Sequence, residues 1–176
     1  MHKDVEKILV SEEVIQHRIE VLAKRVLEKG EDNIVIVVLL KGALVFASDL
    51  FRSMPVMLDV ECLNVSSYHG GLESSGEVKF LDVKMPNFDG KRVIVVDDIY
   101  DTGLTMKAVC DKIGESGAAS VESCVLLAKD KVREVDFEPD YVGFTIGDEF
   151  VIGYGLDYKG KYRNLPYIGV LSVDAI

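Results

Sequence analysis

The chain has 176 residues, of which 48% are hydrophobic, enough for a single domain with a sizeable core. Thirty acidic against twenty basic residues give a formal net charge of -10 at pH 7, which has the wrong sign for binding a nucleic-acid backbone through a basic surface. If the ligand is itself an anion, its site has to oppose this charge locally with a metal ion, backbone N–H groups and a few cations.

The N-terminal part of the sequence predicts a helix, a buried strand and a second helix. Ser11 can cap the first helix, which stops at Gly30 and has apolar positions three or four residues apart: Ile15, Ile19, Leu22 and Val26. Residues 34–40 form a β-branched apolar run, typical of a strand buried on both faces. This longest apolar run is too short to cross a bilayer, and residues 42–52 then resume helical spacing.

The remaining sequence alternates between strands and helices. Residues 92–96 form a second apolar strand that ends at Asp97 and Asp98, and a helix follows over residues 105–115. Residues 68–76, rich in Gly and Ser, predict a mobile loop. Further strands are expected at residues 56–66, 78–83, 121–128 and 141–146, with shorter pieces at 151–152 and 167–171. The alternation predicts an α/β fold with a parallel sheet between helices.

No segment predicts export or membrane insertion. The charged start, Met1-His2-Lys3-Asp4, is no signal peptide, so we expect a soluble, cytoplasmic protein with one domain over residues 1–176. The three cysteines, an odd number without CxxC spacing, suggest neither a disulfide framework nor a zinc site, and we expect buried, reduced thiols. They are Cys62, Cys110 and Cys124.

One segment carries most of the chemistry. Residues 93–105, Val-Ile-Val-Val-Asp-Asp-Ile-Tyr-Asp-Thr-Gly-Leu-Thr, join a buried strand to a helix through a loop rich in side-chain oxygens. Ligands of open α/β sheets gather at the carboxyl ends of strands, and free N–H groups at a helix N-terminus suit a phosphate. Two adjacent carboxylates, Asp97 and Asp98, suit a sugar diol because each hydroxyl can donate to one of them. One loop could therefore hold both ends of a ribose 5-phosphate.

This segment resembles the phosphoribosyl pyrophosphate signature of type I phosphoribosyltransferases: four apolar residues, an acidic pair, then Asp-Thr-Gly-x-Thr. Three further stretches resemble the hypoxanthine-guanine branch of that family, and the similarity covers nearly the whole chain. They are residues 39–46, residues 66–68 with 74–76, and residues 140–144 running on to 165–167. One departure concerns Asp97, because the first acidic position is often Glu in this branch, and the shorter side chain changes the fine geometry.

The resemblance implies a fold, a reaction and partners. The fold is the type I phosphoribosyltransferase fold, a parallel sheet core flanked by helices with a small hood formed by terminal segments. The reaction is purine salvage: the phosphoribosyl group passes from phosphoribosyl pyrophosphate to hypoxanthine, guanine or both, giving IMP or GMP and pyrophosphate. Mg²⁺ is the implied cofactor, and a homodimer or homotetramer the implied assembly. The sequence leaves open the oligomeric state and the preference among hypoxanthine, guanine and xanthine.

The resemblance also assigns the residues that hold the phosphoribosyl substrate. Asp97 and Asp98 match the carboxylates of the ribose diol, which can also associate with metal, and Arg163 matches an arginine that contacts pyrophosphate. Lys41 and Gly42 match a tight loop whose backbone amides meet pyrophosphate, in the family often through a non-proline cis peptide. The 5-phosphate loop corresponds to Asp101, Thr102, Gly103, Leu104 and Thr105. Within it, Asp101 also matches the residue facing purine N7, a candidate general base or proton relay.

A second group matches the residues that bind the purine. Lys129 matches the lysine that donates to the 6-oxo group, Phe150 the ring stacked on the base, and Val151 the backbone that contacts its far edge. Asp157 matches a carboxylate in this region that associates with magnesium, which commonly binds one carboxylate plus substrate oxygens. Residues 66–77 resemble a flexible lid over the reacting centre, with Ser67 and Tyr68 as its contacts. Such a lid would exclude water from an oxocarbenium-like centre.

Other interpretations remain open at this point. Singly, Lys129 could be a solvated strand-end lysine, Phe150 ordinary core packing and Asp101 a helix cap. A regulatory module could sense phosphoribosyl pyrophosphate without chemistry, although it would tolerate loss of Asp101, Lys129 and Arg163, all of which are present. Residues 101–103 are also an Asp-Thr-Gly triplet of the aspartic-protease kind. Those enzymes are β-rich and need a second carboxylate from another lobe or subunit, which the α/β alternation disfavours.

Overall fold

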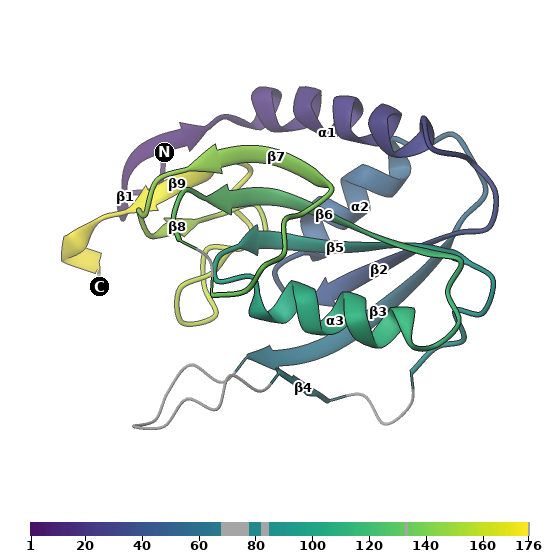
Figure 1. The fold of residues 1–176 in the computed structure, drawn as a ribbon. Coiled ribbons are helices and arrows are strands. Elements are labelled where there is room, and N and C mark those ends of the chain that lie inside the picture. The colour runs from purple at the N-terminus through teal and green to yellow at the C-terminus, as the bar shows by residue number, and fades with distance from the viewer. Residues whose placement is uncertain (68–77, 82–84, 133, 176) are drawn as a thin grey trace.

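The computed structural model describes residues 1–67, 78–81, 85–132 and 134–175, and its main part is a six-stranded sheet (Figure 1). Strands β3, β2, β5, β6 and β7 run parallel in that order, and β4 pairs antiparallel with β3 at one edge. The bounds are Ile34–Leu40 for β2, Asp59–Ser67 for β3, Val78–Phe80 for β4, Arg92–Tyr100 for β5, Ser120–Lys129 for β6 and Tyr141–Ile146 for β7.

Helices cover both faces of this sheet, as the two apolar strands predict. Helices α1 (Glu12–Leu27) and α2 (Leu44–Arg52) pack on one face, against Ile36, Val38 and Ile94 among others. Helix α3 (Leu104–Gly114) packs on the opposite face, against the alternate residues of the same strands, such as Val37 and Val95 (Figure 1). Because both faces of these strands are covered, β2 is apolar throughout and β5 is apolar from Val93 to Val96.

A small antiparallel sheet forms a hood beyond the carboxyl ends of the parallel strands (Figure 1). Its strands are β1 (Val5–Val10), β9 (Ile168–Leu171) and β8 (Val151–Ile152), in the order β1-β9-β8, and the 3₁₀ helix η1 (Val173–Ala175) follows β9. The expected hood of terminal segments is therefore confirmed. Strand β1 itself was not predicted, because its partner β9 lies at the far end of the chain and its local sequence mixes charged and apolar residues.

Several predicted boundaries were wrong. Helix α2 starts at Leu44 rather than at residue 42, because residues 41–43 form a turn. Strand β3 starts at Asp59 rather than at residue 56. Its first paired residue is Asp59, which lies opposite Val35 of β2. Strand β5 continues to Tyr100, which pairs with Ala128 of β6, so Asp97 and Asp98 lie inside the strand and not after it.

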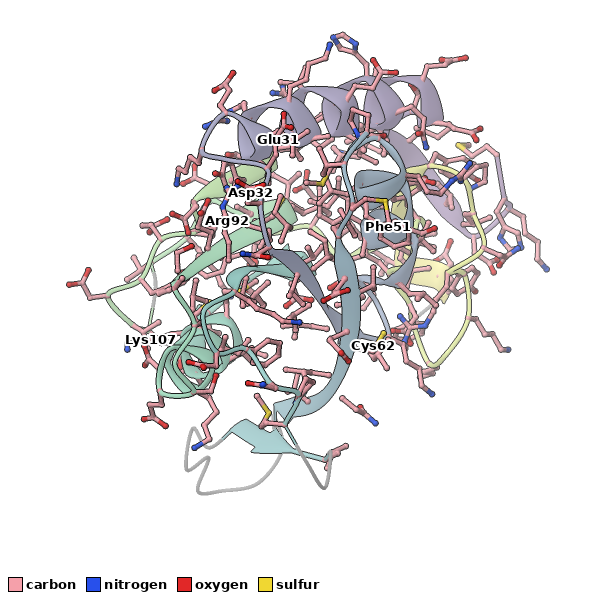
Figure 2. All side chains as sticks on the ribbon, turned by 90° about the vertical axis from the view of Figure 1, so that its right-hand side faces the viewer. Glu31, Asp32, Phe51, Cys62, Arg92 and Lys107 are labelled. Carbon is pink, nitrogen blue, oxygen red and sulfur yellow. The ribbon has the colours of Figure 1, made fainter. Side chains whose placement is uncertain are left out.

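Two further expectations concern single residues. The residues 68–77 of the expected lid, Tyr68 included, lie outside the described part of the chain, while Ser67 is the last residue of β3. Cys124 is buried and Cys110 is partly buried, but Cys62 of β3 is exposed (Figure 2), which contradicts the expectation of buried thiols. In the described residues, no helix has both the length and the apolar character needed to span a membrane.

A buried ionic cluster joins the starting ends of three parallel strands. Arg92 of β5 donates to Glu122 of β6 through Nε and Nη2, at 2.9 and 3.1 Å, and the hydroxyl of Tyr141 in β7 donates to Glu122 Oε2 at 2.6 Å. Arg92 also donates to the carbonyls of Val26 and Gly30 at the end of α1 (Figure 2 shows this end of the sheet). Burial would raise the pKa of Glu122, but hydrogen bonds from Arg92, Tyr141 and Lys29 lower it to about 2.

This cluster yields a stability prediction. We expect Glu122→Gln to lower the free energy of unfolding at pH 7 by about 3 kcal/mol, because it leaves the buried Arg92 guanidinium without a carboxylate. The pKa of Glu122 is lower in the folded state than its usual 4.5, so its contribution is complete above the unfolded-state pKa and disappears as pH falls toward 2. The difference between wild type and variant should therefore shrink between about pH 4.5 and pH 2.

Urea denaturation over this pH range measures the effect. Glu115→Gln is the matched control, because Glu115 pairs with Lys112 in the solvent, with 68% of its side chain exposed. It should change the free energy of unfolding by less than about 0.5 kcal/mol. A Glu122→Gln penalty that stays constant down to pH 2 would contradict the assignment.

Candidate active site

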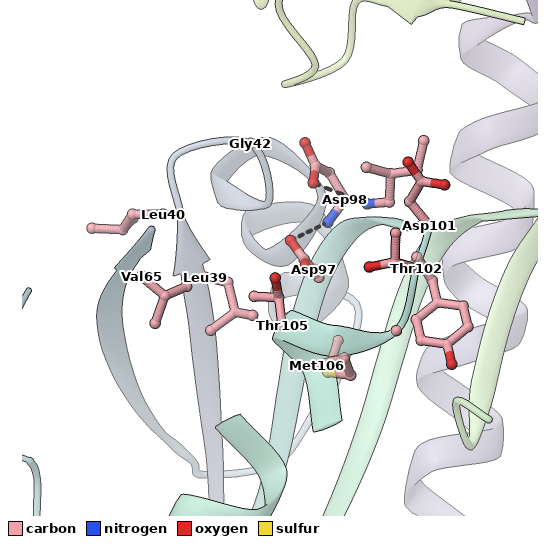
Figure 3. Close-up of a pocket in the computed structure, with 13 residues that line it drawn as sticks. Leu39, Leu40, Gly42, Val65, Asp97, Asp98, Asp101, Thr102, Thr105 and Met106 are labelled. Carbon is pink, nitrogen blue, oxygen red and sulfur yellow. Dashed lines mark hydrogen bonds between the residues drawn. The ribbon is translucent and has the colours of Figure 1, made fainter. Parts of the chain in front are cut away.

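A cavity of about 290 Å³ lies at the carboxyl ends of β2 and β5 (Figure 3). Its wall combines the turn after β2, the end of β5 and the start of α3, which the parallel register brings to the same edge of the sheet. Seven of the predicted phosphoribosyl residues line it: Gly42, Asp97, Asp98, Asp101, Thr102, Gly103 and Thr105. Segments more than fifty residues apart in the chain thus meet as expected.

Asp97 and Asp98 place two carboxylates side by side in this wall. The backbone N–H of Asp98 donates to Asp97 Oδ1 at 2.9 Å, and that of Ile99 donates to Asp98 Oδ1 at 2.9 Å (Figure 3). Burial and the neighbouring charge of Asp98 raise the pKa of Asp97 well above its usual value. Burial also raises the pKa of Asp98, although hydrogen bonds and the charge of Arg163 partly oppose this. The pair therefore favours hydroxyl donors or a cation beside it.

The loop between β5 and α3 is shaped to approach an anion. Gly103 has a φ of 87°, a left-handed conformation that favours glycine, and a Cβ there would lie 2.6 Å from Tyr100 Oη. Thr102 Oγ1 accepts a hydrogen bond from the N–H of Leu104 at 3.4 Å, and Thr105 follows in the first turn of α3. That turn carries no acidic side chain, so its N–H groups and dipole can face a phosphate.

The turn after β2 approaches the acidic pair closely. A Cβ at Gly42 would overlap Asp98 Oδ2, and a Cβ at Gly155 would overlap the carbonyl oxygen of Gly42. The peptide bond between Leu40 and Lys41 is cis, as the resemblance led us to expect for this loop. The Lys41 side chain is exposed and does not line the cavity. Three chain segments therefore meet at Gly42 with no room for a side chain.

A second cavity, of about 230 Å³, adjoins the first. All four predicted purine residues line it: Lys129, Phe150, Val151 and Asp157. The side chain of Lys129 is 14% exposed and forms an ion pair with Asp148 at 3.2 Å. The two cavities share Asp98, Ile99 and Asp101 in their walls, so the two predicted subsites lie on either side of these residues.

Asp157 and Arg163 lie on one loop of the hood and bind each other. Arg163 Nη2 lies 2.6 Å from Asp157 Oδ1, and Arg163 Nη1 donates to the carbonyl of Gly155 at 2.6 Å. Asp157 Oδ2 accepts a hydrogen bond from the N–H of Gly160 at 2.7 Å. Arg163 lines neither cavity, although its charge lowers the pKa of Asp98. Contact with a ligand in the first cavity would require the guanidinium to exchange its present partners.

The carboxylates of the two cavities do not form a metal site by themselves. In the described part of the chain, no group of three or more His, Cys, Asp or Glu side chains is arranged to hold a metal ion. Asp97, Asp98 and Asp157 therefore do not form a complete set of protein ligands. Mg²⁺ usually retains waters and binds one or two carboxylates together with substrate phosphates, so the buried Asp97–Asp98 pair still fits such an ion.

Sequence reasoning missed two features of the site. Ile99 lies in the walls of both cavities, between functional residues of the predicted motif, where an apolar residue gave no separate signal. The ammonium of Lys131 forms an ion pair with Asp101 Oδ1. Nothing in the charged stretch after Lys129 marks Lys131, because only the fold brings it beside Asp101.

Comparisons with known proteins agree with this geometry. The phosphoribosyl transferase domain family matches residues 4–159. The chain is 42% identical over 175 residues to a hypoxanthine-guanine phosphoribosyltransferase of Staphylococcus epidermidis, covering 99% of this chain and 98% of that one. It is 43% identical over 173 residues to a bifunctional protein TilS/HprT of Listeria monocytogenes, but spans only 27% of that protein's length.

Solved structures give the same result. A hypoxanthine phosphoribosyltransferase from Staphylococcus aureus superposes with a TM-score of 0.93 at 40% identity, covering 99% of this chain and 95% of that one. A hypoxanthine phosphoribosyltransferase from Trypanosoma cruzi, solved as a ternary substrates complex, gives a TM-score of 0.91 at 38% identity and covers 99% of both chains.

The contact at Gly42 yields a prediction. In Gly42→Ala, the new methyl group overlaps Asp98 Oδ2, so the Asp98 side chain must rotate away from its present position. We expect phosphoribosyl pyrophosphate to bind at least about tenfold more weakly, a loss of about 1.4 kcal/mol, while the melting temperature changes little. Calorimetric titration and a thermal melt measure the two effects.

Gly114→Ala serves as the control, because a Cβ at that helical glycine would meet no atom within 4 Å. It should leave the affinity close to wild type without lowering the melting temperature, because Ala favours a helix more than Gly does. Unchanged affinity in Gly42→Ala would show that the Gly42–Asp98 contact does not shape the site.

Proposed function

Because this chain belongs to the phosphoribosyl transferase domain family, we propose that it transfers the phosphoribosyl group of phosphoribosyl pyrophosphate to hypoxanthine, guanine or both. The products are IMP or GMP and pyrophosphate, a purine salvage reaction. One observation carries the proposal: two adjoining cavities share the wall formed by Asp98, Ile99 and Asp101. A ribose in the first cavity and a base in the second would meet at this wall, where the new glycosidic bond forms.

In this proposal the first cavity holds the sugar by its two ends. The 2- and 3-hydroxyl groups of the ribose donate to Asp97 and Asp98, whose raised pKa values favour such donors. The 5-phosphate accepts hydrogen bonds from the N–H groups at the start of α3 and from the hydroxyls of Thr102 and Thr105. Holding both ends fixes C1 in front of the base, and this positioning supplies much of the rate enhancement.

The second cavity orients the purine. Lys129 donates to the 6-oxo group and gives up its pairing with Asp148, whose side chain is 81% exposed. Phe150 stacks on the base, and the backbone of Val151 contacts its far edge. As the purine nitrogen bonds to C1 and pyrophosphate leaves, the base loses a ring proton. Asp101, in the shared wall, accepts that proton as general base or relay.

The leaving group needs positive charge in a chain of net charge -10. We assign this role to the amides of Lys41 and Gly42 and to the guanidinium of Arg163, after it exchanges Asp157 for pyrophosphate. Mg²⁺, held by Asp157 or by the Asp97–Asp98 pair, would neutralise part of the pyrophosphate charge when bound. Ser67 and Tyr68 are proposed to close over the site and exclude water, as lid residues.

The cellular setting is also a proposal. We infer that the protein acts in the cytoplasm as a homodimer or homotetramer, without nucleic-acid or membrane partners. Sedimentation equilibrium would test the assembly directly, and a monomer at micromolar concentration would contradict it.

An assay with each purine in turn tests the function. We expect nucleotide from hypoxanthine or guanine in the presence of phosphoribosyl pyrophosphate and Mg²⁺, and very little from adenine. Lys129 can only donate, and adenine presents a donor amino group at position 6. Turnover should stop after chelation of divalent cations and return when Mg²⁺ is added. Comparable rates for adenine and hypoxanthine would refute the role of Lys129, and full activity after chelation would refute the role of the metal.

Substitutions of Asp101, in the loop before α3, and of Thr105, in the first turn of α3, should impair the enzyme in different ways. Asp101→Asn keeps the size of the side chain but removes its basicity, so kcat should fall by about 10²- to 10⁴-fold with little change in KM for phosphoribosyl pyrophosphate. Thr105→Ala removes a hydroxyl bonded to a phosphate that does not react, so binding should weaken by about 1.5 to 3 kcal/mol. Steady-state kinetics separates the two outcomes. Near-normal kcat with raised KM in Asp101→Asn would make Asp101 a binding residue instead.

A further inference from the structure

Lys131 reaches the proposed general base from outside the substrate cavities. Its ammonium forms an ion pair with Asp101 Oδ1, and the two side chains are 34% and 42% exposed. Asp101 lines both cavities, whereas Lys131 lines neither. The lysine therefore contacts the carboxylate without occupying the space in which either substrate would lie.

The fold holds Lys131 in this place through the connection between β6 and β7. The N–H of Glu134 donates to the carbonyl of Thr102 at 3.1 Å, and the hydroxyl of Tyr100 donates to the carbonyl of Phe137. Val135 lies against Gly103, where a Cβ would come within 2.8 Å of its Cγ2. Three contacts thus fix this connection against the end of β5 and the loop that follows, beside the Lys131–Asp101 pair.

Lys131 and Lys129 pair with different carboxylates. Lys129 is already paired with Asp148, at 3.2 Å. The hydrogen bond to Asp101 is the largest effect on Lys131 and raises its pKa, with smaller contributions from the charges of Asp101, Asp148 and Glu134. Lys131 is therefore a cation at neutral pH.

We propose that Lys131 is a positioning residue for Asp101: its ion pair with Asp101 Oδ1 helps to fix the orientation in which the carboxylate receives the proton of the purine. This inference rests on the proposed function and deepens it, because it assigns the orientation of the general base to a residue outside the substrate cavities. A carboxylate anchored through one oxygen has fewer orientations than a free one, and proton transfer depends strongly on orientation.

The test compares Lys131→Met and Lys131→Arg with the wild type, with Lys112→Met as matched control. Lys112 lies in the last turn of α3 and pairs with Glu115, and 52% of its side chain is exposed. For Lys131→Met we expect kcat to fall about 10- to 100-fold while KM for phosphoribosyl pyrophosphate and the melting temperature stay close to wild type. Lys131→Arg keeps a cation beside Asp101 and should restore most of the lost kcat, and Lys112→Met should match wild type.

Each of the other outcomes would overturn the inference about Lys131. If the wild type forms nucleotide and Lys131→Met turns over within about twofold of it, or faster, Asp101 needs no anchor and the inference is overturned. A raised KM with unchanged kcat would make Lys131 a substrate-binding residue and also overturn it. Failure of Lys131→Arg to restore kcat would do the same. If the wild type forms no nucleotide from any purine, the proposed function fails and this inference fails with it.

Discussion

The missing side chain at Gly42 is the constraint on which the site depends. A Cβ there would overlap the carboxylate of Asp98, and the hood glycine Gly155 packs equally closely on the Gly42 carbonyl. The turn after β2, the end of β5 and the hood loop that carries Asp157 therefore converge on one point without an intervening side chain. A larger residue at Gly42 would keep these three segments apart.

The second constraint is electrostatic, because a chain with a net charge of -10 has to bind a highly charged anion. The site opposes this charge with fixed groups and not with a basic surface. The first turn of α3 carries no acidic residue, and the charge of Arg163 acts on Asp98. Lys129 lines the second cavity, and Lys131 pairs with Asp101 in its wall. Such short-range arrangements suffice, because an interaction within a few ångströms outweighs charges that salt screens at longer distance.

The local sequence pattern predicted most of the core, but it failed for strands and side chains whose interaction partners lie far away in the sequence. Strands β2 and β7 were predicted at their observed bounds, because an apolar run flanked by polar residues marks a buried strand. Of the motif at 93–105, residues 97–103 and Thr105 line one cavity. Strand β1, the extension of β5 to Tyr100 and the Lys131–Asp101 pair were missed, because each exists only through pairing or packing with a distant segment.

The charged residues near the two ends of β5 are neutralised to different extents, and this difference links the stability of the protein to ligand binding. At its start, Arg92 and Glu122 neutralise each other within a hydrogen-bonded cluster, which lowers the pKa of Glu122 to about 2. Toward its other end, burial raises the pKa values of Asp97 and Asp98. The folded state therefore disfavours the charged forms of these two carboxylates. A ligand that donates hydroxyl groups to this pair, or brings a cation, removes that penalty only in the folded protein. Binding of such a ligand should therefore raise the free energy of unfolding of the protein.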